Sequence, residues 1–316
     1  MRPMHAVYFD DPCADDVRRQ RLYDGQIFVY SPRPASLAFC KFARQLIEEA
    51  FAPLDPETAQ HQMPVEQFAE ILGRLKPSFI HHQESKRHLR QALSELGCDL
   101  DKTYFDVPKM RSSTSDAYLT TGIAYAWHPH RDTWYSAPAC QINWWMPIYS
   151  IRSENAMAFH PIYWKKAVRN SSAGYNYYAW NQKHRGGHVS QYLKSDPRPL
   201  PKPTEPVDLH PQLRVVCPVG GVIVFSGAQM HSSVPNTSGV TRFSFDFRTV
   251  HEDDVRHRRG APNVDAACTG TTMRDYVRAS DRRQLPDELI AMYDDGSVAE
   301  GVAVYDASKV PVGSET

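Results

Sequence analysis

Long apolar runs are absent from this sequence. No stretch approaches the roughly 18 consecutive apolar residues of a membrane-spanning helix. The first residues, MRPMHAVYFDDP, lack both an apolar core and a small-residue cleavage site. We therefore expect no membrane-spanning segment and no secretory signal, and a cytoplasmic location.

An excess of charge and closely spaced cysteines are absent as well. Lys plus Arg equals Asp plus Glu at 36 each, so the formal net charge is zero and a nucleic-acid partner is not expected. The six cysteines are scattered without a CxxC pair, as is typical of free thiols in a reducing compartment. Internal repeats and low-complexity tracts are also missing, and no pattern indicates an oligomeric state.

The elements that are present change character along the chain. Apolar residues recur at helical spacing in residues 37–52, 65–75 and 88–96. After Tyr104, segments rich in aromatic and β-branched residues predict strands at 117–127, 140–149, 213–217, 221–226 and 241–250. In the last of these, Phe243, Phe245 and Phe247 alternate with polar residues, as in a half-buried strand with one apolar and one polar face.

This order of elements predicts one α+β domain with a mainly-β core, built as a β-sandwich or barrel. We divide the single domain, 1–316, into a helical N-terminal part (1–103), a strand-rich core (104–250) and a C-terminal tail (251–316) with a short helix at 272–278 or 286–293. The core contains a long insertion, 160–210, which is crowded with aromatic and basic residues and then rich in proline. The insertion is either a surface excursion packed by its own aromatic residues or a lid that contacts a polar or anionic substrate.

The segment WHPHRDTW places His130 and Asp132 two residues apart. Residues two apart in a strand point to the same face, so the imidazole and the carboxylate can reach a single ion. His231, which follows the predicted strand GVIVF, can supply a third ligand. Two histidines and one carboxylate on one face of an octahedron leave three positions open, as in the facial triad of non-haem iron(II) oxygenases.

An HxD triplet alone is common, so the residues that follow His231 carry more of the signal. Arg242 lies eleven positions after His231, and Ser244 follows it on the polar face of the predicted strand. A buried carboxylate needs a permanently charged partner that can bind both of its oxygens, and arginine is that residue. A nearby hydroxyl can satisfy a further lone pair of the same carboxylate.

The order HxD, distant histidine, then RxS resembles the iron(II)/2-oxoglutarate-dependent dioxygenases, whose fold is a double-stranded β-helix, or jelly roll. The segment INWWMPIYSIRSENAMAFHPIYWKK is similar to their phytanoyl-CoA dioxygenase branch, which has W-x-P, then E-N-G-x-L, then P-G-S-H. Trp145 and Pro147 fit that pattern, as do Glu154 and Asn155. The segment that begins at His160 departs from it, which argues against a phytanoyl-CoA-like substrate. The resemblance covers roughly residues 100–250.

The resemblance implies a role for each matching residue. His130, Asp132 and His231 would bind Fe(II), and Arg242 with Ser244 would hold the distal carboxylate of 2-oxoglutarate. The implied reaction uses dioxygen, releases succinate and carbon dioxide, and oxidises a C–H bond, most simply by hydroxylation. A small polar organic substrate from secondary metabolism is expected. Related halogenating enzymes carry Gly or Ala where Asp132 stands, so oxygenation is the implied outcome.

Several further residues are candidates for the same site. Gln141 and Asn143 can contact the other end of 2-oxoglutarate. The candidates for substrate contact are Trp145, Tyr163, Trp164, His128 and Arg248.

Two alternatives to this function remain open at the level of sequence. Arg248 follows Arg242 at the R-x5-R spacing found in AlkB-type nucleic-acid demethylases, although a structural salt bridge also accounts for it. His128 and His130 form a His-x-His pair that suits a cupin-type metal protein, which would not use 2-oxoglutarate. The neutral charge weighs against the first alternative, and the RxS motif weighs against the second.

Overall fold

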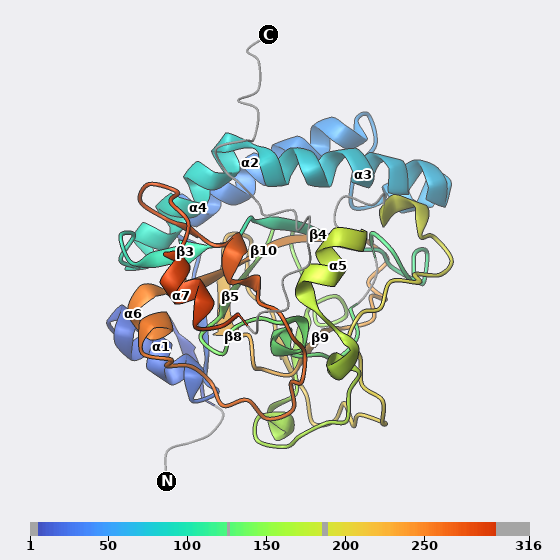
Figure 1. Ribbon diagram of the computed structural model, residues 1–316. Helices are drawn as coiled ribbons and strands as arrows, with labels where there is room; N and C mark the ends of the chain where they lie inside the picture. Colours follow the sequence, from blue (N-terminus) through green and yellow to red (C-terminus); the bar gives the residue numbers. More distant parts are fainter. Residues whose placement is uncertain (1–5, 125–126, 185–188, 295–316) are drawn as a thin grey trace.

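The computed structural model describes residues 6–124, 127–184 and 189–294, which form two β-sheets flanked by helices (Figure 1). The larger sheet contains, in spatial order, β1 (Val7–Phe9), β2 (Ile27–Tyr30), β8 (Val222–Ser226), β5 (Ile142–Pro147), β10 (Arg242–His251), β3 (Thr103–Phe105) and β11 (Val277–Arg278), with β4 (Lys109–Ser113) also paired to β10. The smaller sheet contains β7 (Leu213–Val215), β6 (Met157–Phe159) and β9 (His231–Ser233). All of these pairs are antiparallel except β1 with β2.

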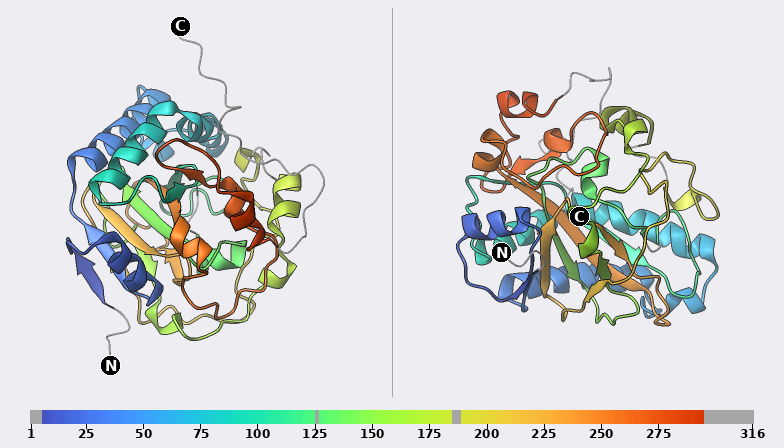
Figure 2. Two further views of the ribbon diagram at one scale, coloured as in Figure 1. Left: turned by 60° about the vertical axis from the view of Figure 1, so that its left-hand side comes forward. Right: turned by 90° about the horizontal axis from the view of Figure 1, so that it is seen from below.

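Three N-terminal helices lie along one side of the larger sheet: α2 (Pro34–Phe51), α3 (Val65–His81) and α4 (Gln83–Glu95). They confirm the helices expected at 37–52, 65–75 and 88–96, and α3 extends beyond the prediction to His81. The remaining helices are α1 (Asp15–Tyr23), α5 (Tyr177–His184), α6 (Glu252–Arg256) and α7 (Asp287–Ala291). Figure 2 shows the N-terminal helices outside the strands.

The helices cover the apolar face of β10. The Phe245 ring lies 4.2 Å from that of Phe39 in α2 and 5.7 Å from that of Phe79 in α3, measured between centroids. The Phe243 ring lies 5.9 Å from that of Phe51 at the end of α2. All five rings are almost completely buried. Burying each phenylalanine contributes on the order of 1.5–3 kcal/mol, so this layer fixes the orientation of β10.

The opposite face of β10 carries Arg242, Ser244, Asp246 and Arg248. We expected this face to be polar and exposed, as in a half-buried strand. Arg242 and Ser244 are instead 5% and 0% exposed, while Asp246 and Arg248 are partly buried. Arg242, Asp246 and Arg248 line a cavity.

Several predicted elements differ in the structure. The predicted strand at 117–127 is a series of turns over 117–124, because Asp116, Ala117 and Gly122 have positive φ angles that interrupt an extended chain. Residues 125 and 126 of that prediction lie outside the described residues. Seven short strands were not predicted: β1, β2, β3, β4, β6, β9 and β11. Around β1 and β2 helical periodicity dominates the neighbouring segments.

The C-terminal predictions are confirmed in part. Residues 272–278 form a 3-10 helix, Thr272–Asp275, followed by β11, and the segment 286–293 contains α7. None of the helices in the described part of the chain is long and apolar enough to cross a membrane.

Candidate metal centre

A pair of backbone hydrogen bonds brings His130 and His231 together. The amide of each residue donates to the carbonyl of the other at 3.0 Å, so the HxD segment lies beside β9. The amide of Asp132 donates to the carbonyl of Gly227 at 2.8 Å, and Asp132 begins a 3-10 helix, Asp132–Tyr135. The segment is thus a single bridge that turns into a helix, and the expectation of a regular strand around His130 was wrong. The turn still directs both side chains to one point.

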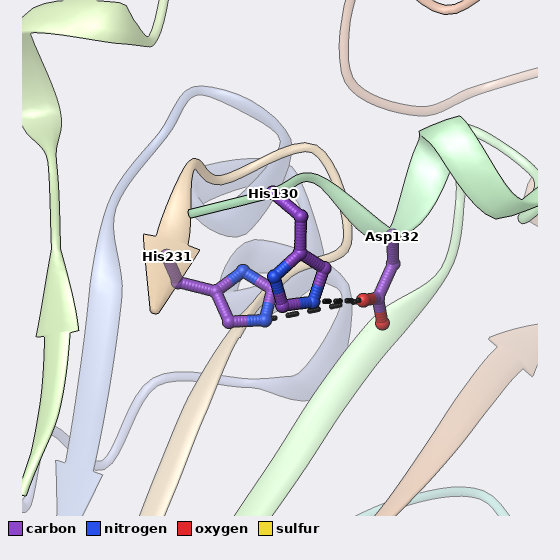
Figure 3. A group of neighbouring side chains, drawn as sticks. All are labelled: His130, Asp132 and His231. Carbon is purple, nitrogen blue, oxygen red and sulfur yellow. Dashed lines mark ion pairs between the residues drawn. The ribbon is translucent and has the colours of Figure 1, made fainter. Parts of the chain in front are cut away.

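The side chains of His130, Asp132 and His231 converge (Figure 3). The Nε2 atoms of His130 and His231 lie 3.5 Å and 3.9 Å from Oδ1 of Asp132. One ligand atom from each of the three residues lies within 4.8 Å of the others, and all three residues are buried. Three donors at this separation can surround one divalent ion, since metal–ligand distances of about 2.0–2.2 Å are usual for nitrogen and carboxylate oxygen.

The other ring nitrogen of each histidine is already engaged. Nδ1 of His130 donates to the carbonyl of His128 at 2.8 Å, and Nδ1 of His231 donates to the carbonyl of Gln229 at 2.9 Å. These bonds fix the tautomer in which Nε2 carries the lone pair. Burial lowers the pKa of both imidazoles, that of His231 to about 4, so the rings are neutral ligands at physiological pH.

Hydrogen-bond donors and a nearby guanidinium orient Asp132 through one of its two carboxylate oxygens. Its Oδ2 accepts hydrogen bonds from Gln141 Nε2 at 2.9 Å and from Asn143 Nδ2 at 2.8 Å, and Arg248 Nε lies 3.6 Å away. Tyr276 donates to Oε1 of Gln141 at 2.7 Å and so fixes that amide. Burial alone would raise the pKa of Asp132, but contact with His130 and the charge of Arg248 hold it well below its usual value. Asp132 therefore stays ionised, with Oδ1 directed to the metal position.

A cavity of about 860 Å³ adjoins the three ligands. Arg242 on β10 lines it, and the Nε atom of Arg242 and the Oγ atom of Ser244 are buried without hydrogen-bond partners among the described residues. Burial lowers the pKa of Arg242 to about 10, so the guanidinium is still charged at neutral pH. Nη1 of Arg242 donates to the carbonyl of Asn155 at 3.2 Å, so the unpaired atoms are Nε of Arg242 and Oγ of Ser244. These two buried polar atoms fit a ligand carboxylate, because unsatisfied buried polar groups are costly. The site residues thus fit both a divalent metal and a dicarboxylate cosubstrate.

The other predicted site residues divide into two groups. Trp145 and Arg248 line the cavity beside Arg242 and Asp132. Tyr163 and Trp164 do not line it: the Tyr163 hydroxyl accepts from the amide of Asp208, and Trp164 packs closely against Gly25. Neither residue is among those that line the cavity, so the prediction of substrate contact does not fit their positions.

Two predictions about neighbouring polar residues also change. Gln141 and Asn143 contact the carboxylate of Asp132, whereas we expected them at 2-oxoglutarate. His128 points its Nε2 to the carbonyl of Pro201 at 2.9 Å and supplies no atom to the group of three ligands. A His-x-His metal site is therefore not the arrangement that the structure shows.

Several residues that line the cavity were not among the predicted site residues. Lys76 in α3, Tyr135 in the 3-10 helix after Asp132, and Tyr175 and Trp180 in the insertion all line the cavity. The high aromatic content of the insertion was a signal for the last two. Lys76 lies in a segment whose helical periodicity indicated only support for the sheet.

Comparisons with known proteins give fold similarities at low identity. No protein-family model matches the chain, and no curated protein matches it. Among solved structures, EvdO2 from Micromonospora carbonacea var. aurantiaca, one form of which is complexed with 2-oxoglutarate, has a TM-score of 0.43 and 11% identity, covering 76% of this chain and 91% of that one.

Two further solved structures resemble the chain to a similar degree. The 2-oxoglutarate-dependent epimerase SnoN from nogalamycin biosynthesis has a TM-score of 0.37 and 14% identity over 75% of this chain and 84% of that one. AviO1 from Streptomyces viridochromogenes Tue57 has a TM-score of 0.38 and 12% identity over 80% of this chain and all of that one. Likenesses of this degree do not establish a function, which rests on the geometry of the metal centre.

Proposed function

We propose that this protein is an Fe(II)- and 2-oxoglutarate-dependent oxygenase that oxidises a C–H bond of a small organic molecule, most simply by hydroxylation. The observation that carries the proposal is the convergence of His130, Asp132 and His231 beside a cavity that also holds Arg242. Two neutral imidazoles and one carboxylate suit iron(II) and leave positions open for other ligands. We propose secondary metabolism as the setting.

We also propose that the two sheets form the double-stranded β-helix of this enzyme class. The larger sheet supplies Arg242 and Ser244 through β10, and the smaller sheet supplies His231 through β9. Residues 1–316 would then be one catalytic domain, in which α2, α3 and α4 support the larger sheet and residues 160–210 cover the site. Residues from both sheets border one cavity, which is the arrangement that such a fold requires.

The site residues would have separate roles in binding the metal and the cosubstrate. The imidazoles of His130 and His231 and the Oδ1 atom of Asp132 would hold the iron, while Arg242 and Ser244 would bind the distal carboxylate of 2-oxoglutarate. When iron and 2-oxoglutarate are bound, they supply the activation of dioxygen, with release of succinate and carbon dioxide. The walls of the cavity orient the substrate and exclude other reductants.

The unpaired polar atoms argue for this proposal over a cupin-type metal protein. A cupin that does not use 2-oxoglutarate has no need for a buried arginine and serine beside the metal. In this protein the Nε atom of Arg242 and the Oγ atom of Ser244 are buried and lack partners among the described residues. The R-x5-R spacing is also accounted for, because Arg248 pairs with Asp106 at 3.2 Å and lies 3.6 Å from Asp132.

The test is anaerobic titration of the purified protein with Fe(II) and then with 2-oxoglutarate, followed by exposure to dioxygen and measurement of succinate. We expect Fe(II)-dependent binding of 2-oxoglutarate and slow succinate formation even without substrate. The His231→Ala variant should lose both, whereas His257→Ala, which changes an exposed histidine, should behave like the unaltered protein. Binding of Fe(II) that survives in His231→Ala, or a protein that binds iron but no 2-oxoglutarate, would refute the proposal.

A further inference from the structure

A row of aromatic rings runs from the metal centre into the insertion. The Tyr135 ring meets the ring of His130 edge-on, with centroids 5.7 Å apart, and meets Tyr175 at 5.6 Å. The Tyr175 ring lies 6.4 Å from that of Trp180 in α5. Tyr135, Tyr175 and Trp180 all line the cavity, and we call them the aromatic wall. The ring faces and edges of such a wall favour flat, conjugated ligands over flexible alkyl chains.

A cationic corner borders the same cavity. The charged groups that act on Lys76 in α3 are Arg111 in β4, Arg242 in β10 and the carboxylate of Asp246, and all four residues line the cavity. Arg111 Nε donates to Asp246 at 2.6 Å, so this pair is neutral. Arg242 is the group proposed for 2-oxoglutarate. Of these three cations, Lys76 therefore has neither a carboxylate partner among the described residues nor a proposed role in binding 2-oxoglutarate.

The surroundings of Lys76 are short of negative charge. Its Nζ atom donates to the carbonyl of Ile123, and none of the described carboxylates lies within ion-pair distance of it. Burial and the nearby charges of Arg111 and Arg242 lower the pKa of Lys76 to about 7, although the carboxylate of Asp246 opposes this shift. An anionic group of a ligand would stabilise the charged form of Lys76, because an ammonium group beside two guanidinium groups is stabilised by an added negative charge.

The volume of the cavity limits the size of the ligand that it can hold. A volume of about 860 Å³ lies at the upper end of drug-sized sites, which span roughly 300–1,000 Å³. It therefore has room for a multi-ring molecule in addition to 2-oxoglutarate. The metal ligand His130 touches the aromatic wall, so a molecule lying on that wall has a ring edge close to the metal position.

We propose that the substrate is a flat aromatic or conjugated ring compound that bears an acidic group. Its ring lies on the aromatic wall and its anionic group binds the ammonium of Lys76. This inference rests on the proposed oxygenase function, since it names the substrate class of the same site. It assigns Lys76 and Trp180 to substrate specificity and leaves Arg242 to the cosubstrate.

The test uses three probes of matched size with the protein loaded anaerobically with Fe(II) and 2-oxoglutarate. The probes are 2-naphthoate, which is flat and anionic, 2-naphthylmethanol, which is flat and neutral, and decanoate, which is anionic and flexible. Calorimetric titration should rank 2-naphthoate above both of the others. Lys76→Met should weaken 2-naphthoate by about tenfold or more and leave 2-naphthylmethanol unchanged, since a charged hydrogen bond contributes about 1.5–3 kcal/mol.

Two more variants complete the test. Trp180→Leu should weaken both naphthalene probes by about two- to tenfold and spare decanoate. Arg74→Ala, on the exposed side of α3 two residues before Lys76, should change nothing. Equal affinity for 2-naphthoate and decanoate would overturn the aromatic part of the proposal. An unchanged 2-naphthoate affinity in Lys76→Met would overturn the anionic part.

The same titrations distinguish a failure of the proposed substrate class from a failure of the proposed oxygenase function. A loss of 2-oxoglutarate affinity in Lys76→Met, with 2-naphthoate binding unaltered, would assign Lys76 to the cosubstrate and refute its role here. Repeating the titrations with metal-free protein shows whether the ring site exists independently. Lys76-dependent binding of 2-naphthoate to a protein that fails to bind Fe(II) or 2-oxoglutarate would support the ligand class and refute the oxygenase.

Discussion

At the scale of single residues, the most informative feature of the site is the asymmetry of the Asp132 carboxylate. Oδ2 accepts two amide hydrogen bonds, while Oδ1 faces the two imidazoles. A carboxylate with one oxygen saturated in this way is disposed to bind a metal through the other. The amides of Gln141 and Asn143 would therefore favour binding of a metal through Oδ1 of Asp132.

Removing one of these amides should weaken iron binding. We expect Asn143→Ala to lower Fe(II) affinity by about 10–100-fold, the usual cost of losing a residue that orients a ligand. Anaerobic titration with Fe(II) measures this effect, and a thermal melt verifies the fold. Gln45→Ala, which removes an exposed amide from α2, is the matched control. Wild-type Fe(II) affinity in a folded Asn143→Ala protein would contradict the positioning role.

Arg242 should affect the cosubstrate and not the metal. Truncating one partner of a buried charge pair costs about 2–5 kcal/mol, so we expect Arg242→Ala to raise the 2-oxoglutarate requirement by about 30-fold or more. Fe(II) affinity should change little. Arg74→Ala, which removes an exposed guanidinium, is the control. An unaltered apparent affinity for 2-oxoglutarate in Arg242→Ala would transfer the anchor to another cation, with Arg248 or Lys76 as the first alternatives.

Asp132 also bears on the type of product. As an iron ligand, its buried, ionised carboxylate would occupy a position that a halide needs and would add negative charge there, so halide binding would be disfavoured. We expect oxygenated, desaturated or cyclised products without halogen, even at high chloride or bromide. Mass spectrometry of products formed under ¹⁸O₂ tests this expectation. A halogen isotope pattern would rule out Asp132 as a metal ligand.

At the scale of elements, the insertion approaches α3 at Gly73 and the turns over 117–124 at Gly122. A Cβ atom on Gly73 of α3 would lie 3.1 Å from the Oγ atom of Ser190, and one on Gly122 would clash with the carbonyl oxygen of Tyr192. The 3-10 helix Val189–Gln191 therefore packs directly on α3. These close approaches place the aromatic residues of the insertion at the cavity.

Substituting Gly122 should loosen this contact. Gly122→Ala adds a Cβ atom against the Tyr192 carbonyl, so we expect faster limited proteolysis within residues 163–192 and little change in Fe(II) affinity. Gly97→Ala is a matched control, because Gly97 has a similar positive φ of 77° and no neighbour within 4 Å of an added Cβ atom. If the insertion is a lid, iron, 2-oxoglutarate and substrate together should slow the same cleavage in the unaltered protein. Equal cleavage of the two variants would show that the contact does not hold the insertion.

At the scale of the whole molecule, the metal centre joins the two sheets. His231 belongs to β9 of the smaller sheet, while Asp132 is hydrogen-bonded to Asn143 in β5 of the larger one. An ion bound at this point stabilises only the assembled fold. By mass action, a metal at 100 times its dissociation constant adds about 2.7 kcal/mol to the free energy of unfolding.

Metal removal should therefore lower the melting temperature. We expect Fe(II), or Mn(II) as a redox-stable substitute, to raise Tm relative to protein in EDTA, because binding is confined to the folded state. The His231→Ala protein should melt at the same temperature with and without metal, and His257→Ala should retain the rise. Differential scanning calorimetry under argon makes the comparison. A metal-induced rise that persists in His231→Ala would place the stabilising ion elsewhere.

The grouping of His130, Asp132 and His231, the α+β class and the strands β5, β7, β8 and β10 could be predicted from the sequence because the determining patterns are local. The alternation of Phe243, Phe245 and Phe247 identifies a strand with two unlike faces, and the HxD and RxS motifs limit the chemistry to a few residue types. Periodicity also located the three long helices, since each buries one apolar stripe.

Only the tertiary structure decided which polar side chains share a cavity. Gln141 and Asn143 lie on Asp132, Lys76 lies on the cavity wall, and Tyr163 and Trp164 lie away from it. Each of these positions depends on contacts between segments far apart in the chain, such as Tyr276 with Gln141. Local sequence patterns do not predict such contacts. The contacts arise from the way in which the two sheets, α3 and the insertion pack around one cavity.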